Sequence, residues 1–308
     1  MIRVSIIIPH YNQPELLRLC LDSLVAQSFP ATDCEIIVVD NATPGGIETV
    51  IADYPEIIFE AELERGAAAA RNAGLARAQG HVIAFIDSDC IADVAWLSAA
   101  VTALDAGGAD MIGGEVRVTC ADPAQPTAVE KFEQVFGFRQ QSYIQTKGFS
   151  VTANLVVRRA VATAVGDFST GVSEDVDWCH RARALGFRLV FHGKAIVSHP
   201  ARRDWPALRV KWSRLIRETY ALEQQAGVSR VSWRLRSVVV ALSAIAHLPR
   251  AALHPLGGSI AQRFKVMGVL VRLRIWRAGK MLGILREVRS GGVAPGWHPA
   301  EVALRNDR

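Results

Sequence analysis

Two aspartates separated by a single serine stand at a point in the chain where they could bind a metal ion. Asp87 and Asp89 directly follow residues 82–86 (VIAFI), an apolar run with the length and residue types of a buried strand. Because side chains two residues apart in an extended segment point the same way, both carboxylates can reach one point. Carboxylates placed like this bind Mg²⁺ or Mn²⁺, with phosphate oxygens and water as further ligands. The alternative is a solvated turn that caps a helix beginning near Val94.

A second group of acids opens a predicted helix at residues 173–185, which begins with the sequence SEDVDW. Ser173 suits the N-cap, and acids in the first turn complement the helix dipole, so a purely structural interpretation is available. One helical face carries Asp175, Trp178, Ala182 and Leu185. We therefore expect Asp175 to point inward beside apolar side chains, where a carboxyl group can act as a general base.

The elements that must position these acids alternate between strand and helix. Apolar runs of strand length occupy residues 4–9, 35–39, 57–59 and 82–86. Helical patterns at residues 15–27 and 67–78 separate them. This alternation predicts an α/β fold with a mostly parallel sheet flanked by helices, and its ligand crevice lies at the carboxyl ends of the strands. Asp40, Asp87 and Asp89 all follow such ends.

Five segments together resemble a known enzyme family. They are VSIIIPHYN (4–12), EIIVVDNAT (35–43), RGAAAARNAG (65–74), HVIAFIDSDC (81–90) and the stretch from GVSEDVDW to AIVSH (171–199). Their order and spacing are similar to those of the family 2 glycosyltransferases, over about the first 200 residues. The resemblance implies the Rossmann-like GT-A fold and an inverting transfer of a sugar from a UDP- or dTDP-sugar to an acceptor.

The resemblance assigns four residues to the nucleotide of the donor. It implies that Tyr11 lies against the nucleobase, that Pro9 shapes the same loop, and that Asp40 hydrogen-bonds the pyrimidine or ribose. It also implies that Arg71 reaches the base or the phosphates. The residues themselves leave alternatives open: a half-buried loop tyrosine, an Asx turn from Asp40 towards Thr43, and a solvated arginine on an alanine-rich helix.

The same resemblance implies a metal site. Asp89 would be the firmer ligand, Asp87 would bind the metal or the ribose, and His199 would be a third ligand. The cofactor would be Mn²⁺ or Mg²⁺, and an imidazole suits manganese at least as well as magnesium. The cation would neutralise the diphosphate and stabilise its departure. A lone histidine at a strand end can also be just a polar terminus.

The catalytic residues implied by the resemblance are Asp175 and Glu174. Asp175 would remove the proton from the acceptor hydroxyl, and Glu174 would orient the acceptor or Asp175. Asp177 would support them, in line with its spacing of four residues from Arg181. Asn154, in the strand-like run at residues 148–157, is expected to contact the substrate.

Charge is divided unevenly along the chain. Residues 1–204 carry 17 Lys and Arg against 25 Asp and Glu, whereas residues 205–308 carry 18 against 5, for a net +5 overall. We expect a glycosyltransferase domain at 1–204 and a basic helical extension at 205–308. The charge-free run at 237–249 is shorter than the roughly 17 to 25 residues that span a bilayer. The extension is therefore expected to lie on an anionic membrane, where a lipid-linked acceptor would reside, although a helical cap or a homodimer interface is the alternative.

The five cysteines are scattered without a C-x-x-C pair, which indicates neither a disulfide framework nor a zinc site and fits a reducing cytosol. The chain enters a strand at once without a leader pattern. Together with the basic extension, these features predict a cytoplasmic protein at the inner face of the cell membrane.

Three other functions were weighed. A sugar-phosphate nucleotidyltransferase needs a glycine-rich basic signature near the N-terminus, which residues 4–12 lack. A degenerate domain that serves as a membrane scaffold would not need the acids at positions 40, 87, 89 and 175. Nucleic-acid binding is not expected, because the C-terminal arginines alternate with aliphatic residues rather than exposed aromatics.

Overall fold

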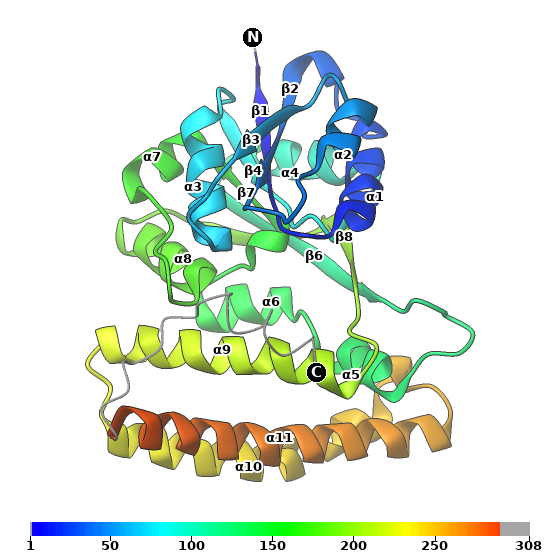
Figure 1. The fold of residues 1–308 in the computed structure, drawn as a ribbon, viewed down its shortest axis with the longest axis vertical. Coiled ribbons are helices and arrows are strands. Elements are labelled where there is room, and N and C mark those ends of the chain that lie inside the picture. Colours follow the sequence, from blue (N-terminus) through cyan, green and yellow to red (C-terminus); the bar gives the residue numbers. More distant parts are fainter. Residues whose placement is uncertain (1, 290–308) are drawn as a thin grey trace. The chain divides into compact units, whose positions relative to one another are not determined.

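The computed structural model describes residues 2–289, which form two compact units (Figure 1). The first unit contains Met1–Arg117, Arg139–Thr170 and Glu174–His199. Among the described residues, the second contains Val118–Phe138, Gly171–Ser173 and residues 200–289. The predicted functional division after residue 204 stays a prediction, and the chain crosses between the units more than once.

An eight-stranded sheet of order β3-β2-β1-β4-β7-β6-β8-β5 forms the centre of the first unit. Its strands are β1 (Val4–His10), β2 (Cys34–Asp40), β3 (Ile58–Ala61), β4 (Val82–Phe85), β5 (Ile91–Ala92), β6 (Met111–Thr119), β7 (Leu155–Arg158) and β8 (Leu189–Pro200). The first four are parallel, as predicted, and β7 pairs antiparallel with both β4 and β6. The sheet is therefore mixed, where the sequence predicted a mostly parallel one.

Helices follow the strands of the first unit. They are α1 (Pro14–Val25), α2 (Glu48–Asp53), α3 (Ala67–Arg77), α4 (Trp96–Asp105), α6 (Gln140–Ser142), α7 (Arg159–Val165) and α8 (Glu174–Ala184), with short turns at Ala31–Asp33, Tyr143–Lys147 and Thr152–Asn154. Gly74 explains why α3 can lie so close to β1, because a Cβ there would stand 2.5 Å from Ile7 Cγ2. Small residues on α3 thus let the helix pack directly on the sheet.

The core next to α8 is aromatic. Trp178 is fully buried and stacks on Phe168, with ring centroids 5.1 Å apart, while Phe85 meets Phe168 edge-on at 5.3 Å. The helix ends at Ala184, and Leu185 is 58% exposed. The prediction that Leu185 shares the buried face is wrong, because the chain leaves the helix before this residue can turn inward.

The second unit consists of helices α5 (Ala128–Phe136), α9 (Trp205–Gln225), α10 (Arg230–Leu253) and α11 (Ile260–Arg289), with a short turn at Pro255–Gly257. Thr127 and Glu130 form a capping box at the start of α5. Among the described residues, α10 is long and apolar enough to cross a membrane by length and composition alone. Its 24 residues extend well beyond the charge-free run at 237–249 on which the sequence prediction relied.

Candidate active site

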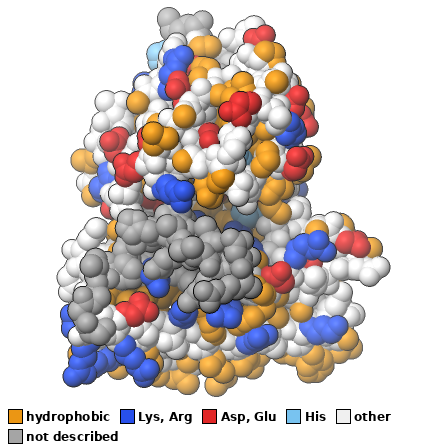
Figure 2. All heavy atoms as spheres, in the orientation of Figure 1, with side chains coloured by type: hydrophobic (Ala, Val, Ile, Leu, Met, Phe, Trp, Pro, Cys, Tyr) orange, Lys and Arg blue, Asp and Glu red, His pale blue; other side chains and the backbone are white. Residues whose placement is uncertain are grey.

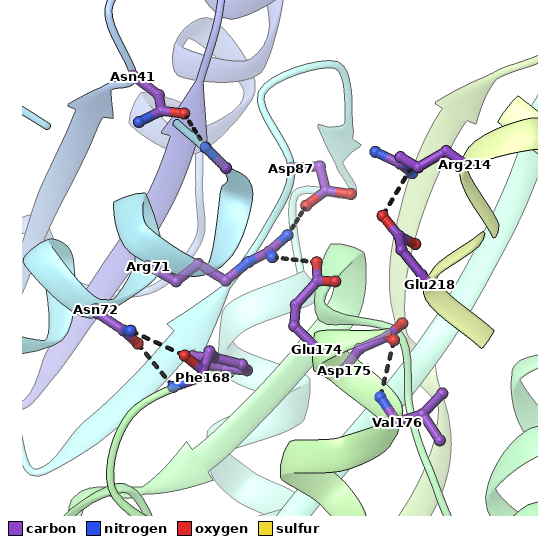
Figure 3. Close-up of polar contacts among 11 residues, drawn as sticks. Asn41, Arg71, Asn72, Asp87, Phe168, Glu174, Asp175, Val176, Arg214 and Glu218 are labelled. Carbon is purple, nitrogen blue, oxygen red and sulfur yellow. Dashed lines mark hydrogen bonds and ion pairs between the residues drawn. The ribbon is translucent and has the colours of Figure 1, made fainter. Parts of the chain in front are cut away.

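A buried arginine joins two groups of acids in the first unit (Figure 3). Arg71 on α3 is only 3% exposed. Its guanidinium donates to Asp87 Oδ1 at 2.8 Å and to Glu174 Oε1 at 2.9 Å. These residues come from the carboxyl end of β4 and the first turn of α8, so one cation holds both elements together. The interpretation of Arg71 as a solvated surface residue is wrong, because its guanidinium is buried and paired with both acids.

Asp175 lies next to this network and is partly buried. Its Oδ1 accepts a hydrogen bond from the backbone N–H of Val176 at 2.8 Å. Burial, followed by the charge of Glu174, raises the pKa of Asp175 from 3.8 to about 7, while Arg71 opposes the shift. A carboxyl group with this pKa can exchange a proton near neutral pH, which is the requirement for a general base.

Asp177 does not join this pair. Its Oδ2 accepts from Ser169 Oγ at 2.8 Å and from Arg181 Nε at 2.9 Å. Arg181 also donates to the carbonyl oxygens of Val165 and Asp167. Asp177 therefore fastens α8 to the preceding loop, which agrees with the expected pairing with Arg181.

Asp89 and His199 form a second cluster. His199 Nε2 lies 3.4 Å from Asp89 Oδ2, and the Cys90 thiol completes a group whose ligand atoms lie within 4.8 Å of one another. Burial raises the pKa of Cys90 well above its ordinary value. The carboxylate and the imidazole offer one oxygen and one nitrogen donor to a divalent cation such as Mn²⁺. Asp87 is not part of this group, and its Oδ1 accepts from Arg71.

The carboxyl ends of β1 and β2 are joined by a hydrogen-bonded network around Asp40. His10 Nδ1 and Thr43 Oγ1 donate to Asp40 Oδ1 at 2.9 and 2.5 Å, and the Thr43 N–H donates to Oδ2 at 3.1 Å. The Asx turn considered from the sequence is thus present. Because His10 Nε2 accepts from the Gln13 N–H, the proton of this imidazole lies on Nδ1. Asp40 is left with one lone pair for a ligand.

Tyr11 lies beside this network and is 39% exposed, with the Arg65 guanidinium 6.0 Å from its ring centroid. Its ring is therefore available for stacking. Pro9 lies within β1, opposite Val39 of β2, in agreement with the strand expected at residues 4–9. The strand can include Pro9 because its pairing with β4 ends at Ile7, so no partner strand on that side needs the missing N–H.

Asn154 has a structural role, contrary to the predicted substrate contact. It is fully buried, and its Nδ2 donates to the carbonyl oxygens of Glu115 and Ala195 at 2.8 and 2.9 Å. Its Oδ1 accepts from Trp96 Nε1 at 2.9 Å. Both ends of the amide are used within the fold, so this side chain offers nothing to a substrate.

Sequence reasoning missed two residues of the site. His10 orients Asp40, and Asn41 fixes the loop before α3 by accepting from the Gly66 N–H and donating to the carbonyl oxygens of Glu62 and Glu64. The sequence could have indicated both residues by their position, because each polar side chain lies at the carboxyl end of an apolar strand.

Comparisons with known proteins agree with this architecture. The family model "Glycosyl transferase family 2" matches residues 5–166. Glycosyltransferase AglE of Haloferax volcanii is 34% identical over 207 residues, which cover 65% of this chain and 67% of the relative. For five further curated relatives, the chain spans only 13% to 35% of their length.

Two solved structures show the same fold. The mannosyltransferase PcManGT of Pyrobaculum calidifontis, in complex with GDP-Man and Mn²⁺, has a TM-score of 0.56 at 18% identity and covers 99% of this chain and 79% of its own. S. aureus TarS 1–349, in complex with UDP-GlcNAc, has a TM-score of 0.52 at 17% identity and covers 94% and 93%. The chain therefore belongs to glycosyl transferase family 2 and is a glycosyltransferase with the GT-A fold.

Proposed function

We propose that this glycosyltransferase is inverting and metal-dependent, and that it transfers a sugar from a UDP- or dTDP-sugar to a glycan or lipid-linked acceptor of a cell-surface polysaccharide. One observation carries the proposal. Asp175, with its pKa near 7, lies beside Glu174, which is tied through Arg71 to Asp87 at the carboxyl end of β4. A candidate base thereby lies beside the network that contains a candidate donor-binding acid.

The donor nucleotide is assigned to the ends of β1 and β2. The exposed ring of Tyr11 can stack on a base, and the free lone pair of Asp40 can accept from a pyrimidine N–H or a ribose hydroxyl. Pro9 restricts the backbone just before this loop. The complexes of TarS with UDP-GlcNAc and of the mannosyltransferase with GDP-Man support a nucleotide-sugar donor.

Asp89 and His199 are assigned to a divalent cation, Mn²⁺ or Mg²⁺, and their mixed oxygen and nitrogen donors favour Mn²⁺. Asp87, whose Oδ1 accepts from Arg71, would offer its other carboxylate oxygen to the cation. A cation bound there would neutralise the negative charge that develops on the departing diphosphate.

Asp175 is assigned to the proton transfer. The Val176 N–H holds one carboxylate oxygen, and the other is left to take the proton from the acceptor hydroxyl. The acceptor oxygen then attacks the anomeric carbon, and the bond from that carbon to the diphosphate oxygen breaks with its electron pair on the nucleoside diphosphate. Attack opposite the leaving group inverts the configuration. Glu174, held by Arg71, positions Asp175.

The proposed place of action is the cytoplasmic face of the membrane. Such a position would bring the site to an acceptor whose lipid anchor lies in the bilayer. The basic composition of residues 205–308 supports it.

The test compares Asp175→Asn with Glu60→Gln, a control that removes a carboxylate paired with Arg77 elsewhere in the first unit. Donor binding is measured by calorimetry with Mn²⁺, and turnover by release of nucleoside diphosphate with a lipid-linked glycan fraction. Loss of about 10² to 10⁴ in turnover with intact donor binding is expected for Asp175→Asn alone. Full turnover in Asp175→Asn would reject the base, and retention of the donor's anomeric configuration in the product would reject inversion.

A further inference from the structure

A long apolar stripe runs along the outer side of α10. From position 231 to 245 its members are spaced three or four residues apart, with one adjacent pair, and the last member follows eight residues later, so all of them lie on one side of the helix. They are Val231, Leu235, Val238, Val239, Leu242, Ile245 and Leu253, each between 54% and 76% exposed. Isolated exposed apolar side chains are ordinary, but a continuous row of this length indicates a surface that is covered in the functional state.

The neighbouring helix α11 extends this stripe. Its exposed apolar residues are Ile260, Phe264, Ile275 and Leu282, between 38% and 76% exposed. The opposite sides of both helices are covered within the second unit, where buried Trp233 donates to the Met281 carbonyl oxygen at 3.0 Å. Figure 2 shows hydrophobic side chains gathered over α10 and α11, with basic side chains beside them. We call these eleven exposed residues of α10 and α11 the apolar stripe.

The charge of the two helices indicates what covers the stripe. Residues 224–289 contain 12 Lys and Arg and a single acid, Glu287. Seven of the basic residues are exposed: Arg230, Arg234, Arg236, Lys265, Arg272, Arg286 and Arg289. Apolar side chains bordered by arginines match the acyl chains and anionic head groups of a bilayer.

A second copy of the chain fits this surface less well. Two stripes packed face to face would bring two strongly positive helix pairs together, with one acid on each to compensate. A position of α10 across the membrane also fits the structure less well. Arg250 of α10 donates to the Val135 carbonyl oxygen of α5, and Trp233 is bonded to α11, so a crossing would break contacts that hold α10 within the unit.

We propose that the apolar stripe of α10 and α11 is a docking surface for a bilayer that contains anionic lipids, with both helices lying parallel to the membrane. The stripe enters the lipid interface, and the bordering arginines contact the head groups. The purpose of the surface, access to a lipid-linked acceptor, rests on the proposed function, but the surface itself does not.

The test uses the full chain in flotation with vesicles of phosphatidylcholine alone or mixed with phosphatidylglycerol. The stripe variant is Val239→Asp with Leu242→Asp. The control variant is Leu19→Asp with Val25→Asp, which places the same charges at two exposed apolar positions of α1. Circular dichroism and donor-induced thermal stabilisation show that each variant is folded and separate this test from the proposed function.

We expect binding to the anionic vesicles that weakens with salt, a decrease of more than about tenfold in the stripe variant, and no change in the control. Equal binding of the stripe variant, or equal binding to phosphatidylcholine alone, would overturn the proposal. If the bound protein resisted alkaline extraction from the membrane, α10 would instead be assigned as a helix that crosses the bilayer. A dimer that the stripe variant converts to monomers, without vesicle binding, would assign the surface to a second copy.

Discussion

The pH dependence of turnover follows from the charges around Asp175. Its pKa of about 7 is raised by burial and, next, by Glu174. Because the base must be deprotonated, the rate is expected to rise with pH through about 7 and then level off. About one tenth of the enzyme is active at pH 6 and about nine tenths at pH 8.

Glu174→Gln removes one negative charge beside Asp175 but keeps an oxygen that can accept from Arg71. The pKa of Asp175 then falls, since the repulsion is lost and the Arg71 cation is less neutralised. A shift of about one pH unit, equivalent to about 1.4 kcal/mol, would leave the variant at about half of its plateau rate at pH 6, against about one tenth for the wild type.

The assay is nucleoside diphosphate release from pH 5.5 to 8.5 at saturating donor and Mn²⁺. Glu60→Gln is the control, because it removes an exposed carboxylate that pairs with Arg77 on another part of the first unit. An unchanged midpoint in Glu174→Gln, or one at higher pH, would refute the electrostatic reasoning. A wild-type rate that does not change between pH 6 and 8 would refute Asp175 as the base.

The raised pKa of Asp175 also affects stability. Because the unfolded carboxyl releases its proton near pH 4, the native state loses stability as the pH rises from about 4 to 7. The rise from 3.8 to about 7 corresponds to about 4 kcal/mol. Because Asp175 is in partial contact with solvent, the destabilisation is reduced to ~2 kcal/mol. Asp175→Asn is therefore expected to unfold at a higher temperature than the wild type at pH 8. At pH 4, no such increase in the unfolding temperature is expected.

Three further substitutions test other parts of the site. Asn154→Ala leaves one buried N–H and two carbonyl oxygens without their partner, so urea denaturation is expected to show a loss of about 2 to 4 kcal/mol, and a neutral result would reject its structural role. His10→Phe removes one of the three hydrogen bonds that orient Asp40, so UDP is expected to bind about tenfold more weakly by calorimetry, and unchanged affinity would remove His10 from the donor site. Asp89→Asn or His199→Ala is expected to weaken Mn²⁺ binding by at least about tenfold in electron paramagnetic resonance titrations, and equal affinity would place the metal elsewhere.

The sequence predicted the parallel half of the sheet well. Residues 4–9, 35–39 and 82–86 are predominantly apolar and are followed by polar side chains, which is typical of buried parallel strands. Of the antiparallel half, the strand-like run predicted at 148–157 contains most of β7. Strand β6 and most of β8 were not predicted, because β6 contains Gly113, Gly114 and Glu115 and β8 is interrupted by polar residues. Such strands lack the continuous apolar run on which the prediction relied.

The partners of individual site residues required the fold. Arg71 and Glu174 are 103 residues apart in the chain, and nothing local indicates that one buried arginine joins Glu174 and Asp87. Likewise, the polar break around Asn154 resembles a binding loop, but the amide is used entirely by buried backbone and indole groups. Local patterns predict where a polar side chain stands, whereas its partners depend on tertiary packing.

The central claim is that the first unit binds a nucleotide-sugar with a divalent cation and cleaves it. The most direct measurement incubates the purified protein with UDP-, dTDP- and GDP-sugars, with and without Mn²⁺, and records thermal stabilisation and nucleoside diphosphate release. We predict Mn²⁺-dependent stabilisation and turnover with one uridine or thymidine diphosphate sugar, both lost in Asp89→Asn. Folded protein that binds no donor under any of these conditions would contradict the account.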